Sequence, residues 1–229
     1  MEKTKIKAHS AVLIANVIFG LGVPVTKLLL DDWVSPMAYM ASRFIGATII
    51  FWLVSLFLPR EHVYPKDLLV IMAGGLLGFV ISLTLSAWAL NYTTPVYFSF
   101  IASLTPVATM ALAALFIGEK LSGRGVFGVI IGIVGTMLMV LMGWQGGSGS
   151  NDLLGIVLAL LSMLTWAGYL IITRSVSTKY SAVTQLKWIF LVATIAILPF
   201  SWSDLQGATL YSSAWQWSGM LEMVFIVLI

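Results

Sequence analysis

Two long apolar runs separated by a short charged turn constrain this chain more than any other feature. The runs extend over residues 100–117 and 126–142, and each is close to the ~20 residues that an α-helix needs to cross the hydrocarbon of a bilayer. The turn at 118–124 contains charges and glycines that a bilayer interior would exclude. Residues 99–143 are therefore predicted to form a hairpin of membrane-spanning helices.

The composition extends this interpretation to the whole chain. Of the 229 residues, 60% are hydrophobic and only 9% are charged, against about 25% charged residues in globular domains. The apolar runs recur, so they are not one removable signal peptide.

The chain has no cysteine, which excludes disulfides, thiolate metal sites and cysteine nucleophiles. His9 and His62 lie at the edges of apolar runs, so neither a metal nor a cofactor is expected. The net charge of +3 is attributed to loops rather than to a nucleic-acid surface.

Eight segments are predicted to span the membrane, at 10–30, 36–58, 68–90, 100–117, 126–142, 153–173, 182–201 and from Trp215 to the last residue. Loops rich in Lys and Arg stay cytoplasmic. If the segments cross the membrane in alternating directions, their ends fall on two sides. The ends on one side have no Lys or Arg, and the ends on the other side hold Lys3, Lys5, Lys7, Arg60, Lys66, Lys120, Arg124, Arg174 and Lys179. The amino terminus is therefore predicted to be cytoplasmic, in a plasma or inner membrane.

Two motifs of the hairpin identify a family. Leu104-Thr105-Pro106-Val107 lies midway along its first helix, and Phe116-Ile117-Gly118-Glu119-Lys120-Leu121-Ser122 ends that helix before a glycine-spaced second one. This pattern resembles the EamA-type transporters of the drug/metabolite transporter superfamily. The resemblance implies ten helices in two homologous halves of five, with amino acids or drugs passing between the halves and export as the common direction.

A weak internal repeat agrees with this resemblance. When the first and sixth helices are aligned, Phe19-Gly20 falls on Trp166-Ala167 and Lys27 falls on Arg174. Five helices separate the two segments, so they would cross the membrane in opposite directions, as in the inverted repeats of secondary transporters. The predicted fold is an all-α polytopic bundle with a first repeat at 1–143, a Gly/Ser-rich linker at 144–152 and a partial second repeat of about three helices at 153–229. Because two further family helices are missing, the chain is expected to be a fragment or a truncated product.

Arg43 is the strongest candidate for contact with a substrate. A rise of about 1.5 Å per residue from Pro36 places it roughly 10 Å inside the second helix, where a permanent charge is costly and usually faces a bundle interior or a wet cavity. Arg43 is predicted to attract a substrate carboxylate or another anion. The alternatives are pairing with carbonyls or an acid, and snorkelling to the interface.

Other polar or aromatic positions have a structural interpretation beside the functional one. Lys27 is predicted mainly to pair with Asp31, four residues later on the same face. Pro106 removes a backbone hydrogen bond and frees a carbonyl for a substrate or a neighbour. A pathway role and helix packing both stay open for Asn16, Trp166 and Tyr169. Packing is the favoured interpretation for the small hydroxyl residues, with a pathway role as the alternative for the first two; they are Ser99, Ser103, Ser82, Ser86 and Thr93.

Residues Gly118, Glu119 and Lys120 of the hairpin ending are expected to have a structural role at the cytoplasmic boundary. Gly128 and Gly132 form a GxxxG pair, which is typical of close helix packing. Glu222 lies early in the eighth helix, where a proton-coupling role and a partnership with Arg43 are both open.

The function predicted is secondary transport of a small organic metabolite, an amino acid or a drug-like compound, by alternating access. The chain lacks the phosphate-binding motif G-x-x-x-x-G-K-[ST], so the energy would come from a gradient or a partner, with a proton as a candidate coupling ion. The expected partners are the bilayer and the substrate, without nucleic acid, and a homo-oligomer is left open. The alternatives are a non-transporting fragment or partner subunit and, third, an intramembrane enzyme acting on lipid.

Overall fold

The computed structural model describes residues 2–32, 34–118 and 149–207, with a few positions between 119 and 148. All regular secondary structure in this part of the chain is helical. The helices are α1 (Glu2–Asp32), α2 (Pro36–Leu56), α3 (Pro65–Gly75), the π-helical segment η1 (Leu76–Ser82), α4 (Leu83–Tyr92), α5 (Pro95–Ser103), α6 (Thr105–Ile117), α8 (Asp152–Ser177) and α9 (Ala182–Gly207).

Capping residues explain where several helices begin. Pro36 and Pro95 occupy the first turns of α2 and α5, where the missing backbone N–H costs nothing. The residues before them, Ser35 and Thr94, accept hydrogen bonds from the second N–H after each proline. Asn151 caps α8 in the same way, because its side-chain oxygen accepts from the N–H of Leu154 at 3.2 Å.

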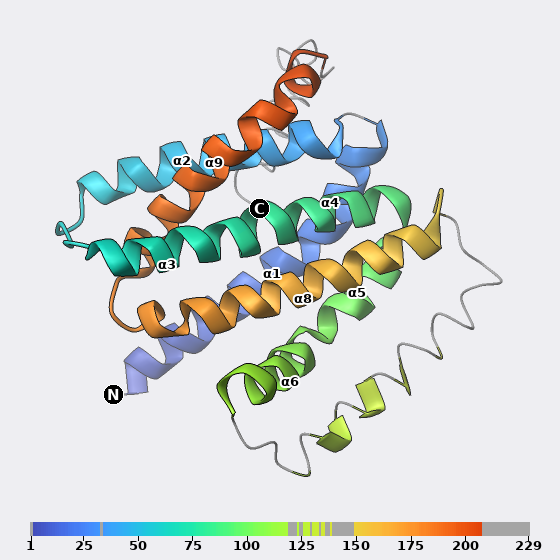
Figure 1. Cartoon of the computed structure of the whole chain (residues 1–229), viewed down its shortest axis with the longest axis horizontal. Helices are drawn as coiled ribbons and strands as arrows, with labels where there is room; N and C mark the ends of the chain where they lie inside the picture. Colours follow the sequence, from blue (N-terminus) through green and yellow to red (C-terminus); the bar gives the residue numbers. More distant parts are fainter. Residues whose placement is uncertain are drawn as a thin grey trace.

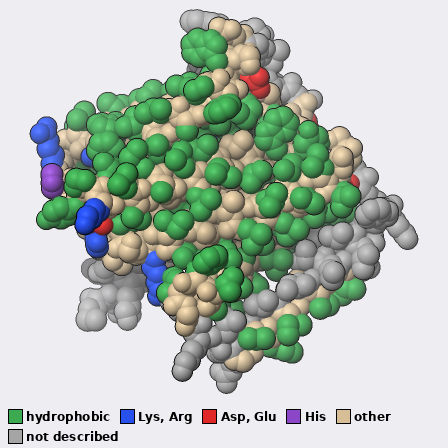
Figure 2. Space-filling view, in the orientation of Figure 1, with side chains coloured by type: hydrophobic (Ala, Val, Ile, Leu, Met, Phe, Trp, Pro, Cys, Tyr) green, Lys and Arg blue, Asp and Glu red, His purple; other side chains and the backbone are tan. Residues whose placement is uncertain are grey.

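Five segments of the described chain are long and apolar enough to cross a membrane: Pro36–Leu56, Pro65–Tyr92, Pro95–Ile117, Asp152–Ser177 and Ala182–Gln206. Their surface is apolar, as expected of side chains that face lipid. In the view of Figure 2, Lys and Arg gather at one end of this apolar surface. The prediction of an all-helical membrane bundle is confirmed. The inverted relation between its halves stays a prediction, as do the domain boundaries.

The long rod formed by α3, η1 and α4 lies at the centre of the bundle (Figure 1). We call α1–α6 the N-terminal group, and α8 and α9 the C-terminal group. Helix α8 packs along the rod and also contacts α5 and α6, whereas α9 packs against α2 and the other side of the rod. The C-terminal group is therefore held on the N-terminal group by extensive helix contacts.

The fourth predicted span is divided at Leu104 into α5 and α6. Pro106 cannot donate to the carbonyl of Ala102, and the Thr105 hydroxyl donates to that carbonyl instead, at 2.7 Å. The sequence left two partners open for the freed carbonyl, a substrate or a neighbour. The structure shows a neighbouring side chain in this position. Helix α6 ends at Gly118, which adopts a left-handed conformation with φ +72°.

Glycines allow the central rod to approach both C-terminal helices. A Cβ added at Gly78 would lie 2.4 Å from the Tyr169 ring on α8, and one at Gly74 would lie 2.3 Å from the methyl group of Thr173. A Cβ added at Gly75 would lie 3.2 Å from the backbone of Ile189 on α9. Gly74 and Gly78 thus form a GxxxG pair that the sequence analysis missed.

Candidate functional site

A cluster of hydroxyl groups joins the rod to α8 halfway along both helices. Ser82 donates to the backbone oxygen of Ser162 at 2.8 Å, and its Oγ lies 3.2 Å from the Ser162 Oγ. Ser86, one turn later, lies 2.6 Å from the same Oγ. Ser82 and Ser162 are buried. Ser82 is the last residue of η1, and π-helical segments occur frequently at functional sites because they redirect side chains.

An aromatic cluster lies beside these hydroxyls, and Phe79 is at its centre. The Phe79 ring centroid lies 5.6 Å from Trp166, 5.5 Å from Tyr169 and 5.1 Å from Phe190. Trp166 and Tyr169 come from α8 and Phe190 from α9, so Phe79 connects the rod with both C-terminal helices. The hydroxyl and aromatic clusters together are called the central layer below.

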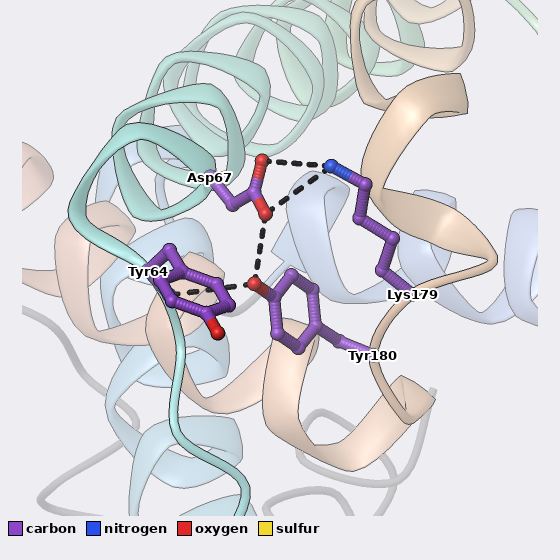
Figure 3. Close-up of polar contacts among 4 residues, drawn as sticks. All are labelled: Tyr64, Asp67, Lys179 and Tyr180. Atoms are coloured by element: carbon purple, nitrogen blue, oxygen red, sulfur yellow. Dashed lines mark hydrogen bonds and ion pairs between the residues drawn. The ribbon is translucent and has the colours of Figure 1, made fainter.

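At one end of the bundle, where Lys and Arg gather, hydrogen bonds connect the N-terminal group with the C-terminal group. We call this end of the bundle the basic end. The Asp67 carboxylate accepts from Lys179 Nζ at 3.2 and 3.3 Å, and from the Tyr180 hydroxyl at 2.8 Å (Figure 3). The Tyr180 hydroxyl in turn accepts from the N–H of Tyr64 at 3.3 Å. These contacts join the start of α3 to the α8–α9 loop.

Glu61 adds a second connection at the basic end. Its carboxylate accepts from the Ser181 N–H at 3.0 and 3.3 Å and from the Ser181 hydroxyl at 3.1 Å. Ser181 precedes α9, so the Glu61 charge also faces the positive end of a helix dipole. The hydroxyl of Thr184 and the donors of Ser181 hold the pKa of Glu61 below its ordinary value of 4.5. Glu61 is therefore ionised at neutral pH and holds the α2–α3 loop on the start of α9.

Similar connections occur at the opposite end of the bundle. Thr93 donates to the Asp152 carboxylate at 2.6 Å, and Ser35 donates to the Asp204 carboxylate at 2.6 Å. The N–H of Asn151 donates to the backbone oxygen of Tyr92 at 3.1 Å. Each of these bonds joins the N-terminal group to the start of α8 or the last turns of α9.

The arrangement places polar connections between the two groups at both ends, with the central layer between them. The bonds at the two ends are the polar contacts that would have to separate if either end of the bundle opened. Hydrogen bonds at exposed ends are individually weak, at about 1 kcal/mol net, so one end can open without unfolding the helices.

Among the predicted residues, Trp166 and Tyr169 are brought together at 5.1 Å, and both pack against Phe79. The predicted pair of Lys27 with Asp31 is confirmed at 2.8 Å, and Lys27 also donates to the backbone oxygen of Asn91.

The remaining predicted positions are spread over the bundle. Arg43 is half-buried beside the fully buried Phe44. Asn16 is exposed on α1, and Ser99, Ser103 and Pro106 are exposed on α5 and α6. Gly132 lies against the side chain of Leu104, whereas a Cβ at Gly128 would meet open space. Glu119, Lys120 and Glu222 lie outside the described residues. A pathway role for any of these positions stays a prediction.

The connections at the basic end were missed by the sequence analysis. Asp67 and Lys179 lie 112 positions apart in the chain, and Lys179 was interpreted only as one of the cytoplasmic basic residues. The available signal was that the loops at 59–67 and 174–181 were predicted at the same membrane face, the first with the acids Glu61 and Asp67 and the second with Lys179. In the described part of the chain, no three His, Asp or Glu side chains form a group that could hold a metal ion.

Comparison with known proteins gives a consistent result. The model of the EamA-like transporter family matches residues 6–141. The uncharacterized transporter YetK of Bacillus subtilis is 24% identical over 88% of this chain and 62% of its own length. The WAT1-related protein At2g40900 of Arabidopsis thaliana is 29% identical over 69% of this chain and 46% of its own length.

A crystal structure of a protein that is 22% identical to this chain shares its fold, with a TM-score of 0.52 over 80% of this chain and 66% of that chain. The chain thus spans about three fifths or less of the curated relatives YetK and At2g40900.

Proposed function

The chain belongs to the EamA-like transporter family, and we propose that it works as a secondary transporter that moves a small organic metabolite across the cytoplasmic membrane. One observation carries the proposal: the N-terminal and C-terminal groups are joined by hydrogen bonds at both ends of the bundle, with the central layer between them. The relatives named as transporters support the same class of activity.

The proposed mechanism is alternating access around the central layer. Opening the basic end requires loss of the bonds that Asp67 and Glu61 make to the α8–α9 loop. Opening the other end requires loss of the bonds that Asp152 and Asp204 accept. The central layer would act as the pivot, because its aromatic contacts and buried hydroxyl bonds hold the two groups closely together. The amino terminus is placed on the cytoplasmic side with the basic end, in keeping with the positive-inside rule.

The proposed substrate is an amino acid or a drug-like compound, with export as the direction and a proton as the coupling ion. Arg43 would attract a carboxylate or another anionic group from a half-buried position on α2. Trp166 and Tyr169 would pack against an apolar or aromatic part of the substrate. The proposed pathway also includes Asn16, Ser99, Ser103 and Pro106.

One buried oxygen supports a polar contact near the pivot. The Thr84 hydroxyl oxygen is buried and has no hydrogen-bond partner among the described residues. Thr84 lies two positions from both Ser82 and Ser86, about half a helical turn around α4 from them. A buried oxygen without a partner is costly, so a polar group of the substrate or a bound water would be stabilised there.

Transport by the full-length protein tests the proposal. Proteoliposomes that contain it are expected to accumulate at least one labelled compound from a panel of amino acids and drugs.

Arg43→Ala is expected to reduce flux of an anionic substrate at least tenfold, because a hydrogen bond to a charged group contributes about 1.5–3 kcal/mol. The exposed Arg60 at the basic end supplies the control, since Arg60→Ala should leave flux unchanged. Absence of flux for the whole panel would overturn the transport proposal, and wild-type flux in Arg43→Ala would remove Arg43 from the pathway.

A further inference from the structure

A lysine and two tryptophans form a compact group on the surface between α2 and α9. Lys187 Nζ lies 5.6 Å from the ring centroid of Trp52 and 5.9 Å from that of Trp188. The two indole rings meet edge to face, with centroids 5.6 Å apart. Trp52 belongs to the last turns of α2 and Lys187 to the first turns of α9, so the group lies toward the basic end. We call these three residues the Lys–Trp group.

The surroundings of the Lys–Trp group are apolar and exposed. The last turns of α2 present Ile49, Leu53 and Leu56 at the surface, with exposed fractions of 56%, 54% and 71%. Trp52 itself is 37% exposed. In a membrane protein, such side chains contact lipid tails. The lysine therefore lies at the edge of a surface that faces the bilayer.

The length of α9 places Lys187 near the boundary between hydrocarbon and headgroups. The span Ala182–Gln206 has 25 residues, so it is about 37 Å long at 1.5 Å per residue. The hydrocarbon is ~30 Å thick, so each end of the span extends about 3–4 Å beyond it. The Cα of Lys187 then lies about 4 Å inside the hydrocarbon, and its flexible stem can bring the ammonium group to the headgroups.

Within the described part of the chain, the polar atoms of the group form no hydrogen bond or ion pair. Among the described residues, no acid lies within ion-pair distance of Lys187, and no acceptor takes a hydrogen bond from the indole N–H of Trp52 or Trp188. Glu61 is near enough to experience the charge of Lys187, but its carboxylate accepts from Ser181. A cation with two unused N–H donors at headgroup depth has the chemistry needed to bind a phosphodiester anion.

We propose that the Lys–Trp group binds the phosphate of an anionic phospholipid from the leaflet at the basic end. The ammonium group of Lys187 would supply the charge, and the indole N–H groups would donate hydrogen bonds to phosphate oxygens. The acyl chains would lie along the exposed apolar side chains of α2. Since Trp52 belongs to the N-terminal group and the other two residues to the C-terminal group, the bound lipid would bridge them at this end of the bundle.

Lipid binding can be measured without any transport assay. The full-length protein in detergent is titrated with phosphatidylglycerol or with phosphatidylcholine, while the melting temperature and the lipid adducts in native mass spectra are recorded. Phosphatidylglycerol is expected to bind more tightly and to raise Tm more. Lys187→Gln should weaken phosphatidylglycerol binding about tenfold, the loss expected when one charge-assisted hydrogen bond to an anion is removed. Lys187→Arg should retain it.

Matched variants separate this site from general charge attraction. Lys66, an exposed lysine at the same end, supplies the control, and Lys66→Gln should bind phosphatidylglycerol like the wild type. Replacing both tryptophans by phenylalanine keeps aromatic rings near the lysine but removes the N–H donors, so it should weaken binding. Equal binding of the two lipids, or full phosphatidylglycerol binding by Lys187→Gln, would overturn the proposal. An equal rise in Tm with inorganic phosphate alone would overturn the assignment to a lipid.

Discussion

Replacing Phe79 by alanine is expected to destabilise the folded bundle by about 3 kcal/mol, the lower end of the range for phenylalanine truncation in a core. Phe79 is only 8% exposed, and its ring contacts Trp166, Tyr169 and Phe190. The lower end applies because the alternative environment is lipid, which is as apolar as a protein core. The loss is then one of packing contacts rather than of transfer from water. Reversible unfolding in mixed micelles of mild detergent and dodecyl sulfate measures this difference.

The exposed Phe200 on α9 is the matched control for this truncation, because its side chain is 74% exposed. Phe200→Ala should change the unfolding free energy by less than about 0.5 kcal/mol, as substitutions away from packed contacts usually do. If both truncations cost the same, Phe79 does not hold the C-terminal helices on the rod.

Adding a single methyl group at Gly78 is expected to cost about 1–3 kcal/mol. The new Cβ would lie 2.4 Å from Cγ and 2.7 Å from Cβ of Tyr169, atoms that cannot move without shifting α8. The central layer would then be pushed apart, although alanine is a better helix former than glycine. The melting temperature of the purified Gly78→Ala protein, followed by size-exclusion chromatography after heating, records the loss.

Gly20 on α1 is the control for Gly78, because an added Cβ there meets nothing within 4 Å. Gly20→Ala should leave the melting temperature unchanged or raise it slightly through helix propensity. A Gly78→Ala protein as stable as the wild type would show that the rod and α8 are not in close contact.

Most of the fold could be predicted from hydropathy, because in lipid each spanning segment must satisfy its own backbone hydrogen bonds. The observed helices contain the predicted spans 10–30, 153–173 and 182–201. The break at Leu104 was less accessible. A proline inside an apolar run predicts a lost hydrogen bond. Whether the helix bends or divides there depends on whether a neighbouring side chain, here the Thr105 hydroxyl, donates to the freed carbonyl.

The site was harder to predict, because its contacts join residues far apart in the chain. Ser82 and Ser86 were recognised in the sequence, and packing was the favoured interpretation for both; their contact with Ser162 was not predicted. Their convergence depends on how α8 docks against η1, and hydrophobic periodicity carries no information on this. Lys187 was missed for another reason: one charge inside a long apolar segment does not interrupt the segment, so the segment was interpreted as a span without comment.

Reversible cross-linking of the two ends tests the proposal of alternating access most directly. These 229 residues contain no cysteine, so pairs can be introduced without removing native cysteines from this part of the protein. One pair replaces Glu61 and Ser181 at the basic end, and the other replaces Ser35 and Asp204 at the opposite end, where the side chains are hydrogen-bonded. A third pair at Ser177 and Gln185 lies within the C-terminal group and is the control.

The full-length protein with each pair is placed in proteoliposomes, and substrate flux is measured before cross-linking, after it and after reduction. Alternating access predicts that either end pair, once linked, stops transport and that reduction restores it, whereas the control pair has no effect. Transport at the unlinked rate with either end held closed would contradict the account.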